Sequence, residues 1–304
     1  MEFQQPALLL THTDADGFGC ALSVKEHCRI NGLPDPEVMF LDYGMPAPDV
    51  TGRMVIITDF SFKRNVMQEI CDKAKSVVLI DHHASTEKDL KGFEHPNAKI
   101  IIDTTHAASY LVWDYFLRNG NNRTPYIIRY IEDHDIWIKK LPHTEEITLF
   151  INTLDFKKDY VNAQEYLSDE WWFDNRPDMV KIGGGILKYI ENETEQLLSK
   201  GIDRMNINGF DVPCINNKFN VSAIGNRISV NEPFSAQYSV RDGVLAFSLR
   251  SQPNGEDVAV IAESFGAGGH KAASGFGIPV DKVDWDEFYI NGKLVLKKSD
   301  RDEK

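Results

Sequence analysis

The sequence has no apolar run close to the ~20 residues that a membrane-spanning helix requires. Its first residues, Met-Glu-Phe-Gln-Gln-Pro, lack the basic region of a secretory signal. Only four cysteines occur, and no two of them form a C-x-x-C pair, which disfavours structural zinc and thioredoxin-type chemistry. We therefore expect a cytoplasmic protein that does not bind a membrane and whose cysteines are free and buried.

Positive charge is also scarce. The 304 residues include 33 Lys and Arg against 46 Asp and Glu, which gives a formal net charge of −13. This balance argues against a protein that coats long duplex DNA, because such a protein needs a broad cationic face. It is compatible with a small nucleotide that is held locally by metal ions. The length is enough for about two domains.

Short apolar runs alternate with amphipathic stretches in the first half of the chain. The runs predict strands over residues 7–11, 37–41, 54–58, 76–80 and 99–102. Helices are predicted over residues 18–30, 63–75 and 107–117. Strands that alternate with helices indicate an α/β fold with a doubly wound, mostly parallel sheet that is covered by helices on both faces.

The second half begins with helices and then returns to strands. Helical patterns cover residues 124–133, 145–153, 160–167 and 179–200, strand patterns cover 210–215, 234–239 and 244–249, and a last helix covers 257–265. We expect a first domain over 1–178, a linker helix over 179–200 and a smaller α/β domain over 201–304. The run Gly183-Gly184-Gly185 does not follow a strand, as a phosphate-binding loop would, so it predicts a kink or a close helix contact.

Three ligand-type side chains follow the first predicted strand. His12, Asp14 and Asp16 occupy alternate positions, and Gly17 follows them. In an extended chain this spacing directs all three side chains the same way, and ligands bind at the carboxyl ends of strands in open parallel sheets. An EF-hand loop is excluded because its twelfth position, counted from His12, is Ser23 rather than Glu. A divalent metal site and a cluster that caps the next helix both remain open.

Further carboxylates and imidazoles end the neighbouring segments. Asp59 closes the strand at 54–58, Asp81-His82-His83 closes the strand at 76–80, and Glu132-Asp133-His134-Asp135 ends a predicted helix. Carboxylates that crowd together raise each other's pKa unless cations neutralise them. Mixed oxygen and imidazole ligands favour manganese over calcium or structural zinc. The pattern predicts two metal ions, an arrangement typical of enzymes that hydrolyse phosphate esters.

The ordered motifs resemble the DHH phosphoesterase superfamily. In the first domain they are His12-x-Asp14-x-Asp16-Gly17, Asp59, Asp81-His82-His83 and Asp133. In the second domain, Ser248-Leu-Arg250-Ser251 ends a strand, and residues 266–276 are similar to the GGGH signature of the associated DHHA1 domain, with Ala267 replacing its first glycine. The first motif has the spacing of RecJ-type exonucleases, with His for their first Asp, as in the longer nanoRNase branch. The subfamily is therefore left open between these two branches.

The resemblance implies a role for each motif residue of the first domain. One metal would be held by His12 and Asp14, the other by Asp16, His82 and Asp133, and Asp59 would bridge both. A water bridging the two cations would be the nucleophile, because they lower its pKa. Asp81 would orient the imidazoles, and His83 would face the phosphate or leaving oxygen. Asp135 competes with Asp133 as a ligand, whereas His106 and His134 are interpreted as structural or surface residues.

In the second domain, the resemblance implies that Arg250, Gly268, Gly269 and His270 bind the substrate. The guanidinium of Arg250 matches the geometry of phosphate oxygens, and the glycines allow backbone N–H groups to approach an anion closely. The alternative interpretation is a surface charge at a strand end and an ordinary turn. The implied active site lies between the two domains.

We expect a manganese-dependent phosphodiesterase that hydrolyses dinucleotides, short oligonucleotides or a linearised cyclic dinucleotide with two Mn²⁺ ions, which Mg²⁺ or Co²⁺ could replace. Its partner is a short nucleic acid or nucleotide, and a homodimer is one assembly that this prediction allows. The acidic surface favours small substrates over the extended cationic track of a processive exonuclease. The alternatives are a RecJ-like single-strand 5′–3′ exonuclease, a pAp phosphatase and an inactive nucleotide-binding scaffold.

Overall fold

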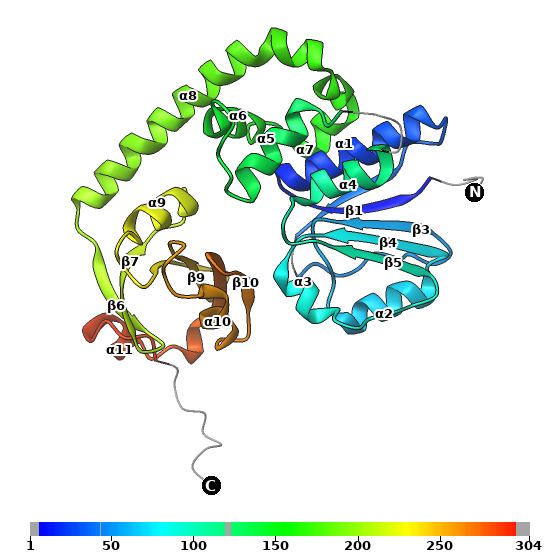
Figure 1. The fold of residues 1–304 in the computed structure, drawn as a ribbon. Coiled ribbons are helices and arrows are strands. Elements are labelled where there is room, and N and C mark those ends of the chain that lie inside the picture. Colours follow the sequence, from blue (N-terminus) through cyan, green and yellow to red (C-terminus); the bar gives the residue numbers. More distant parts are fainter. Residues whose placement is uncertain (1–5, 43, 119–122, 296–304) are drawn as a thin grey trace. The chain divides into compact units, whose positions relative to one another are not determined.

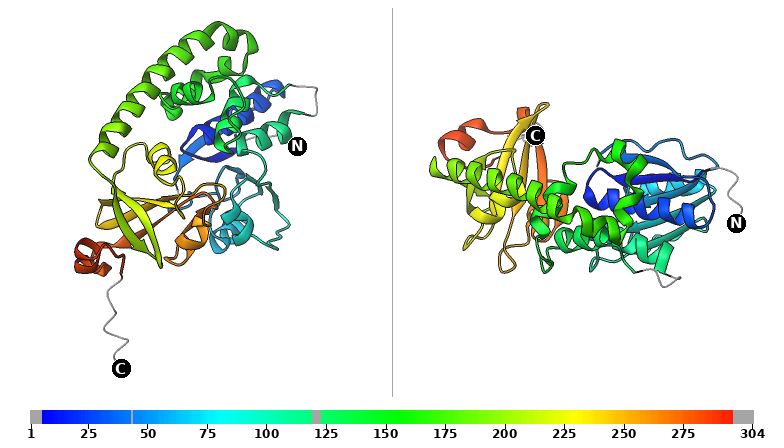
Figure 2. Two further views of the ribbon diagram at one scale, coloured as in Figure 1. Left: turned by 60° about the vertical axis from the view of Figure 1, so that its left-hand side comes forward. Right: turned by 90° about the horizontal axis from the view of Figure 1, so that it is seen from above.

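The computed structural model describes residues 6–42, 44–118 and 123–295 of the chain. It forms two compact units, Met1–Tyr189 and Ile190–Lys304, which are drawn as ribbons in Figures 1 and 2. Among the helices of the described residues, none is both long and apolar enough to span a membrane. The boundary between the units lies inside the linker helix predicted over residues 179–200. The domain limits at residues 178 and 201 remain a prediction.

The first unit is built on a five-stranded sheet with the order β2-β1-β3-β4-β5, in which every pair is parallel. The strands are β1 (Leu8–His12), β2 (Glu37–Leu41), β3 (Met54–Thr58), β4 (Ser76–Asp81) and β5 (Ala98–Ile102). Successive side chains of β1 point to opposite faces of the sheet. Leu9 packs into the core under one layer of helices, whereas Leu8 and Leu10 pack into the core under the other.

Helices cover both faces of this sheet, as the sequence predicted. Figure 1 shows α1 (Ala15–Ile30) and α4 (Ala108–Leu117) on one face, and α2 (Arg64–Lys73) on the other, with α3 (Ala84–Asp89) near its end. Phe18 of α1 and Val112 of α4 belong to one core, and Met67 and Ile70 of α2 belong to the other. The doubly wound α/β fold predicted from the alternating apolar runs is therefore confirmed.

A helical region follows the sheet in the same unit. It contains α5 (Tyr126–Asp135), α6 (Thr144–Ile151), α7 (Phe156–Asp159), a 3-10 helix (Tyr160–Leu167) and the start of α8 (Asp169–Ser199). The structure begins α8 ten residues before the predicted position 179, although Pro177 lies inside it. A Cβ atom on Gly183 would lie 1.7 Å from the carbonyl oxygen of Glu146. The glycine run therefore permits a close contact between α8 and α6, one of the two predicted interpretations.

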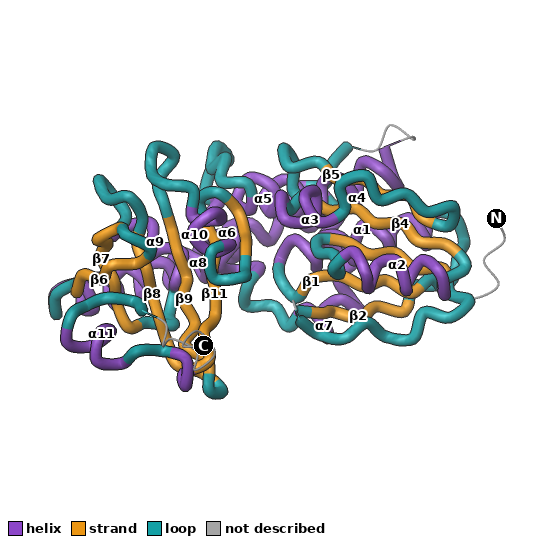
Figure 3. Tube along the Cα trace, turned by 90° about the horizontal axis from the view of Figure 1, so that it is seen from below, coloured by secondary structure: helices purple, strands orange, loops and turns teal. Residues whose placement is uncertain are grey.

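The second unit has a six-stranded sheet with the order β10-β11-β9-β8-β7-β6. The strands are β6 (Asp203–Ile207), β7 (Phe210–Asn216), β8 (Ser235–Arg241), β9 (Val244–Arg250), β10 (Gly268–His270) and β11 (Ala273–Pro279). Only the β7–β8 pair is parallel. The helices are α9 (Val221–Ile228), α10 (Val258–Glu263), α11 (Trp285–Ile290) and a 3-10 helix (Val280–Lys282). Figure 3 distinguishes these helices from the strands.

Three strands of the second unit were missing from the sequence prediction. β6 reads Asp-Arg-Met-Asn-Ile, β10 has three residues, two of them glycine, and β11 contains two glycines and ends at Pro279. Glycine and charged residues are depleted in strands, so propensity gave no signal there. Pairing with neighbouring strands defines these elements instead.

Candidate metal centre

Three adjacent strands of the first unit bring the motif residues to one edge of the sheet. Thr11 of β1 pairs with Thr58 of β3, which in turn pairs with Ile80 of β4. His12, Asp59 and Asp81 occupy the next position along each strand, so they lie side by side at the carboxyl edge of the sheet. This edge is the usual ligand-binding edge of an open parallel sheet.

The first motif forms a tight turn between β1 and α1. Asp14 is the N-cap of α1 and accepts a hydrogen bond from the backbone N–H of Gly17 (2.9 Å), while its other oxygen lies 2.6 Å from Nδ1 of His12. A Cβ atom on Gly17 would lie 2.1 Å from the carbonyl oxygen of His12. The glycine is therefore required by the tight turn, and Asp14 can cap the helix while it stays beside His12.

Two buried threonines stabilise this turn by hydrogen bonds, and the sequence analysis did not identify them. The hydroxyl of Thr58 donates to that of Thr11 (2.9 Å), which donates to the carbonyl oxygen of Gly17 (3.0 Å). Both side chains are fully buried. The sequence could have indicated them, because each threonine directly precedes a candidate ligand, His12 or Asp59, at the end of a neighbouring strand.

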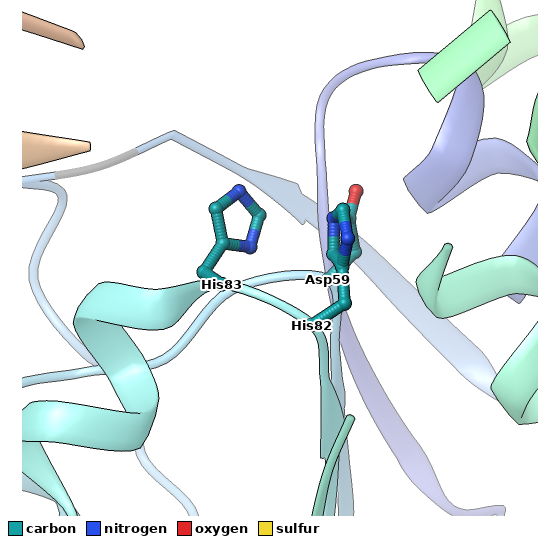
Figure 4. A group of neighbouring side chains, drawn as sticks. All are labelled: Asp59, His82 and His83. Carbon is teal, nitrogen blue, oxygen red and sulfur yellow. The ribbon is translucent and has the colours of Figure 1, made fainter. Parts of the chain in front are cut away.

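Asp59 lies between two groups of side chains. Its Oδ1 is 3.5 Å from Nε2 of His82, and its Oδ2 is 3.8 Å from Nδ1 of His12. Asp59 is buried, its backbone has a left-handed φ of 62°, and no hydrogen-bond donor reaches its Oδ2 among the residues that the structure describes. A buried carboxylate oxygen without a donor requires another partner. Figure 4 shows Asp59 beside His82, with His83 next to them.

On the other side of Asp59, His82 contacts two carboxylates. Its Nε2 lies 3.4 Å from Oδ2 of Asp135 at the end of α5 and 3.7 Å from Oδ2 of Asp16 in α1. The oxygens of Asp16 also accept hydrogen bonds from the backbone N–H groups of Ala108 (2.8 Å) and Ser109 (2.9 Å) at the start of α4. These two bonds fix the orientation of the Asp16 carboxylate.

The structure brings Asp135 to His82, whereas the sequence analysis favoured Asp133. Both oxygens of Asp133 accept hydrogen bonds from the segment after α5: from the backbone N–H of Lys140 (2.9 Å), from that of Leu141 (3.0 Å) and from the hydroxyl of Thr144 at the start of α6. Residues two apart on a helix point to different sides. Asp133 therefore holds the loop, and Asp135 is the member of the pair at the candidate centre.

Asp81 organises the two histidines that follow it. Its Oδ1 accepts hydrogen bonds from the backbone N–H of His82 (2.7 Å) and of His83 (3.3 Å) and lies 2.8 Å from Nδ1 of His83. The contact with Asp81 leaves Nε2 of His83 as the ring nitrogen directed away from this carboxylate. This arrangement fits the predicted orienting role of Asp81.

The electrostatics of the cluster are those of a site that lacks positive charge. Burial, and then the carboxylates of Asp14 and Asp16, raise the pKa of Asp59 well above its usual range. Burial followed by Asp16 does the same to the pKa of Asp135. Burial opposes ionisation of Asp14, but its hydrogen bonds with His12, Asp59 and Gly17, together with the charge of His12, outweigh burial and lower the pKa of Asp14 to about 2. Divalent cations would stabilise the ionised carboxylates.

Within the described part of the chain, three groups have ligand atoms that lie within 4.8 Å of one another: His12, Asp14 and Asp59; Asp16, His82 and Asp135; and Asp59, His82 and His83. The first and second groups contain the ligands predicted for the two metal ions, with Asp135 in place of Asp133. Asp59 belongs to the first group, and its Oδ1 lies 3.5 Å from Nε2 of His82 in the second, so it lies between them. The oxygen and imidazole donors fit ions such as Mn²⁺.

In the second unit, Arg250 and His270 lie in one row of the sheet. Ala273 of β11 pairs with Arg250 of β9 on one side and with His270 of β10 on the other. Arg250 donates hydrogen bonds to the carbonyl oxygen of Leu249 (2.7 Å) and to the hydroxyl of Ser222 (2.9 Å), and burial lowers its pKa. Gly268 and Gly269 pair with Gly275 and Ser274 in the same hairpin. The residues predicted to bind the substrate are therefore neighbours in this sheet.

Two known proteins are similar to this chain in sequence. No family model matches the chain. An uncharacterized protein, R106, of Acanthamoeba polyphaga mimivirus is 29% identical over 257 residues, which cover 77% of this chain and 57% of the relative. The chain thus spans little more than half of that relative's length. The oligoribonuclease NrnB of Bacillus subtilis is 22% identical over 297 residues, covering 89% of this chain and 72% of the relative.

Solved structures share the fold. The DHH domain of a protein described as a member of a ribosomal protein family superposes with a TM-score of 0.54 and 15% identity, covering 89% of this chain and 82% of that chain. The pGpG-specific phosphodiesterase PggH of Vibrio cholerae gives a TM-score of 0.52 and 16% identity over 93% and 97% of the two chains. The fold is thus that of DHH-domain proteins. This fold agrees with the resemblance of the ordered motifs to the DHH/DHHA1 phosphoesterase superfamily.

Proposed function

We propose that this protein is a manganese-dependent phosphodiesterase that hydrolyses dinucleotides and short oligonucleotides. The observation that carries the proposal is the position of Asp59, whose two oxygens face the His12–Asp14 pair and the group of Asp16, His82 and Asp135. Two bound cations would polarise the phosphodiester and supply a nucleophile at neutral pH. NrnB is named as an oligoribonuclease and PggH as a pGpG-specific phosphodiesterase, and both names support a short substrate.

The residues of the chain have separate tasks in this proposal. His12, Asp14, Asp16, Asp59, His82 and Asp135 hold the two ions, and Mg²⁺ or Co²⁺ could replace Mn²⁺. Asp81 fixes the ring of His83, so that Nε2 of His83 can donate a proton to the leaving oxygen. Arg250 and His270, with the backbone of Gly268 and Gly269, bind a phosphate or the terminal nucleotide of the substrate.

A ladder of substrate lengths tests the proposal. End-labelled RNA and DNA of two, five and twenty nucleotides are incubated with the protein and Mn²⁺, and the products are separated by length. We expect the rate to fall steeply from two to twenty nucleotides, because the net charge of −13 disfavours the long cationic track that binds a polymer. Comparison of RNA with DNA identifies the preferred sugar.

Other outcomes of the same experiment favour the alternative functions. Equal rates at all lengths with stepwise release from the 5′ end favour a RecJ-like exonuclease. Release of phosphate from pAp without cleavage of dinucleotides favours a pAp phosphatase. Tight Mn²⁺ and nucleotide binding without any turnover favours an inactive scaffold.

A further inference from the structure

His106 and Glu132 form a pair that the metal centre does not use. Nδ1 of His106 lies 2.6 Å from Oε1 of Glu132, and the His106 ring stacks on Tyr110 with 4.4 Å between ring centroids and 16° between ring planes. The side chain of His106 is 41% exposed, whereas that of Glu132 is only 13% exposed. The ring is therefore held firmly from one side and remains accessible from solvent.

The loop that carries His106 leaves the sheet beside the Asp81-His82-His83 motif. Ile102, the last residue of β5, pairs with Asp81 of β4. The backbone N–H of Asp103 then donates to the carbonyl oxygen of Asp81 (3.1 Å). His106 follows three residues later, at the same carboxyl edge of the sheet as the candidate metal centre.

Two further observations place His106 near Asp16 and Asp135 of the candidate metal centre. Ala108, two residues after His106, donates its backbone N–H to Oδ2 of Asp16 (2.8 Å), and two residues span at most ~7 Å. Glu132 precedes Asp135 by three residues on α5, so the two carboxylates lie on one face of the helix. Asp16 and Asp135 both contact His82, and His106 is therefore at the rim of this group.

The chemistry of the pair suits an anionic substrate. The contact of 2.6 Å between Nδ1 and the carboxyl group of Glu132 leaves Nε2 as the ring nitrogen directed away from Glu132. A proton on Nε2 makes this nitrogen a hydrogen-bond donor. A phosphodiester gains negative charge on its non-bridging oxygens as water attacks it, and a fixed donor beside those oxygens stabilises that charge.

We propose that His106 donates a hydrogen bond from Nε2 to a non-bridging oxygen of the phosphate that is cut, and that Glu132 is the positioning residue for its ring. This inference rests on the proposed function and adds a residue that the metal sites do not contain. Because the contact is strongest in the transition state, it contributes mainly to kcat.

The test compares four variants with the wild type: His106→Ala, His106→Gln, Glu132→Gln and the control His95→Gln. His95 also pairs with a carboxylate, since its Nε2 lies 3.1 Å from Asp72. It precedes β5, so it lies at the amino edge of the sheet, away from the metal centre. Each protein is assayed with Mn²⁺ on a dinucleotide and on bis-p-nitrophenyl phosphate, and bound Mn²⁺ and Tm are measured.

We expect His106→Ala to lower kcat about 10- to 100-fold on both substrates, with KM nearly unchanged, because both contain the phosphate that is cut. His106→Gln, which keeps a neutral donor, and Glu132→Gln, which keeps an acceptor for the ring, should lose less. Bound Mn²⁺ should stay at the wild-type level in all variants, and His95→Gln should match the wild type.

Two results would overturn the inference alone: a wild-type kcat in both His106 variants, or a loss of kcat that parallels a loss of bound Mn²⁺. The second result would make the His106–Glu132 pair a support of the metal centre. A wild-type protein that cleaves neither substrate would overturn the proposed function and this inference together. The wild-type assay therefore separates the two failures.

Discussion

The sheet edge of the first unit gathers hydrogen-bond acceptors, whereas the corresponding row of the second unit gathers donors. Asp59 is a buried carboxylate that no donor reaches at Oδ2 among the described residues. Arg250 is a half-buried guanidinium that donates only to a carbonyl and a hydroxyl in the part of the chain that the structure describes. Residues 1–200 hold 21 basic and 32 acidic side chains, and residues 201–304 hold 12 and 14. The first unit therefore suits cations, whereas the second unit offers the donors of Arg250 to the proposed substrate phosphate.

The largest effect is expected from Asp59, since its carboxylate faces both groups of ligands. Asp59→Ala should remove bound Mn²⁺ from both sites. Mutation of a residue that only orients a metal ligand lowers activity by up to ~100-fold, and we expect a larger loss of turnover here. Metal content by elemental analysis and turnover of a dinucleotide check this. Bound Mn²⁺ near the wild-type stoichiometry would contradict the bridging assignment.

The next prediction separates Asp135 from Asp133. Asp135→Asn should weaken Mn²⁺ binding and turnover by about 10- to 100-fold or more, with the fold intact. Asp133→Asn should keep the metal but lower the free energy of unfolding by about 1.5–3 kcal/mol, the range for hydrogen bonds to charged groups.

Titration with Mn²⁺ and thermal unfolding of both variants distinguish the two residues. The prediction fails if Asp133→Asn loses the metal while Asp135→Asn keeps it. That outcome would restore the assignment that the sequence favoured.

A more selective effect is expected in the second unit. Arg250→Ala should leave Mn²⁺ binding unchanged and reduce kcat/KM for a dinucleotide with a terminal phosphate about 10- to 150-fold, by the energy of a charge-assisted contact. Most of the loss should appear in KM if the contact is equally strong in the ground and transition states. Bis-p-nitrophenyl phosphate, which lacks a terminal phosphate, is the control substrate. An equal loss on both substrates would assign Arg250 to the fold or to the metal centre.

The smallest effect concerns pH. Burial and neighbouring carboxylates raise the pKa values of Asp59 and Asp135 in the folded, metal-free protein. Their protonated forms therefore stabilise the metal-free fold at low pH, and this contribution is lost as the pH rises towards the folded pKa values. Mn²⁺ must displace these protons, so its stabilising effect should grow with pH.

The measurement is the difference in Tm between samples with Mn²⁺ and with EDTA, from pH 5 to pH 8. A rise in this difference with pH is expected. A difference that is constant over the range would argue against proton release from the cluster.

The strands and motifs of the first unit were predictable because their signals are local. A buried parallel strand is a short continuous apolar run, and a polar residue directly after such a run must lie at the carboxyl edge of the sheet. His12, Asp59 and Asp81 could be placed together by this rule alone. In the second unit the rule failed for β6, β10 and β11, since glycine and charged residues obscure the pattern.

The sequence by itself determined the α/β fold of the first unit, the edge at which its carboxylates gather and the preference of that edge for cations. Only the tertiary structure decided which side chains meet there. Asp133 and Asp135 have similar surroundings in the sequence, and the path of the loop at Lys140 and Leu141 decides which of them faces His82. His106 and Glu132 are 26 residues apart and meet through the packing of α4 on α5. The spacing of residues along the chain decides which way their side chains point within one helix or strand. The distance between side chains of different elements depends on how the apolar faces of these elements pack.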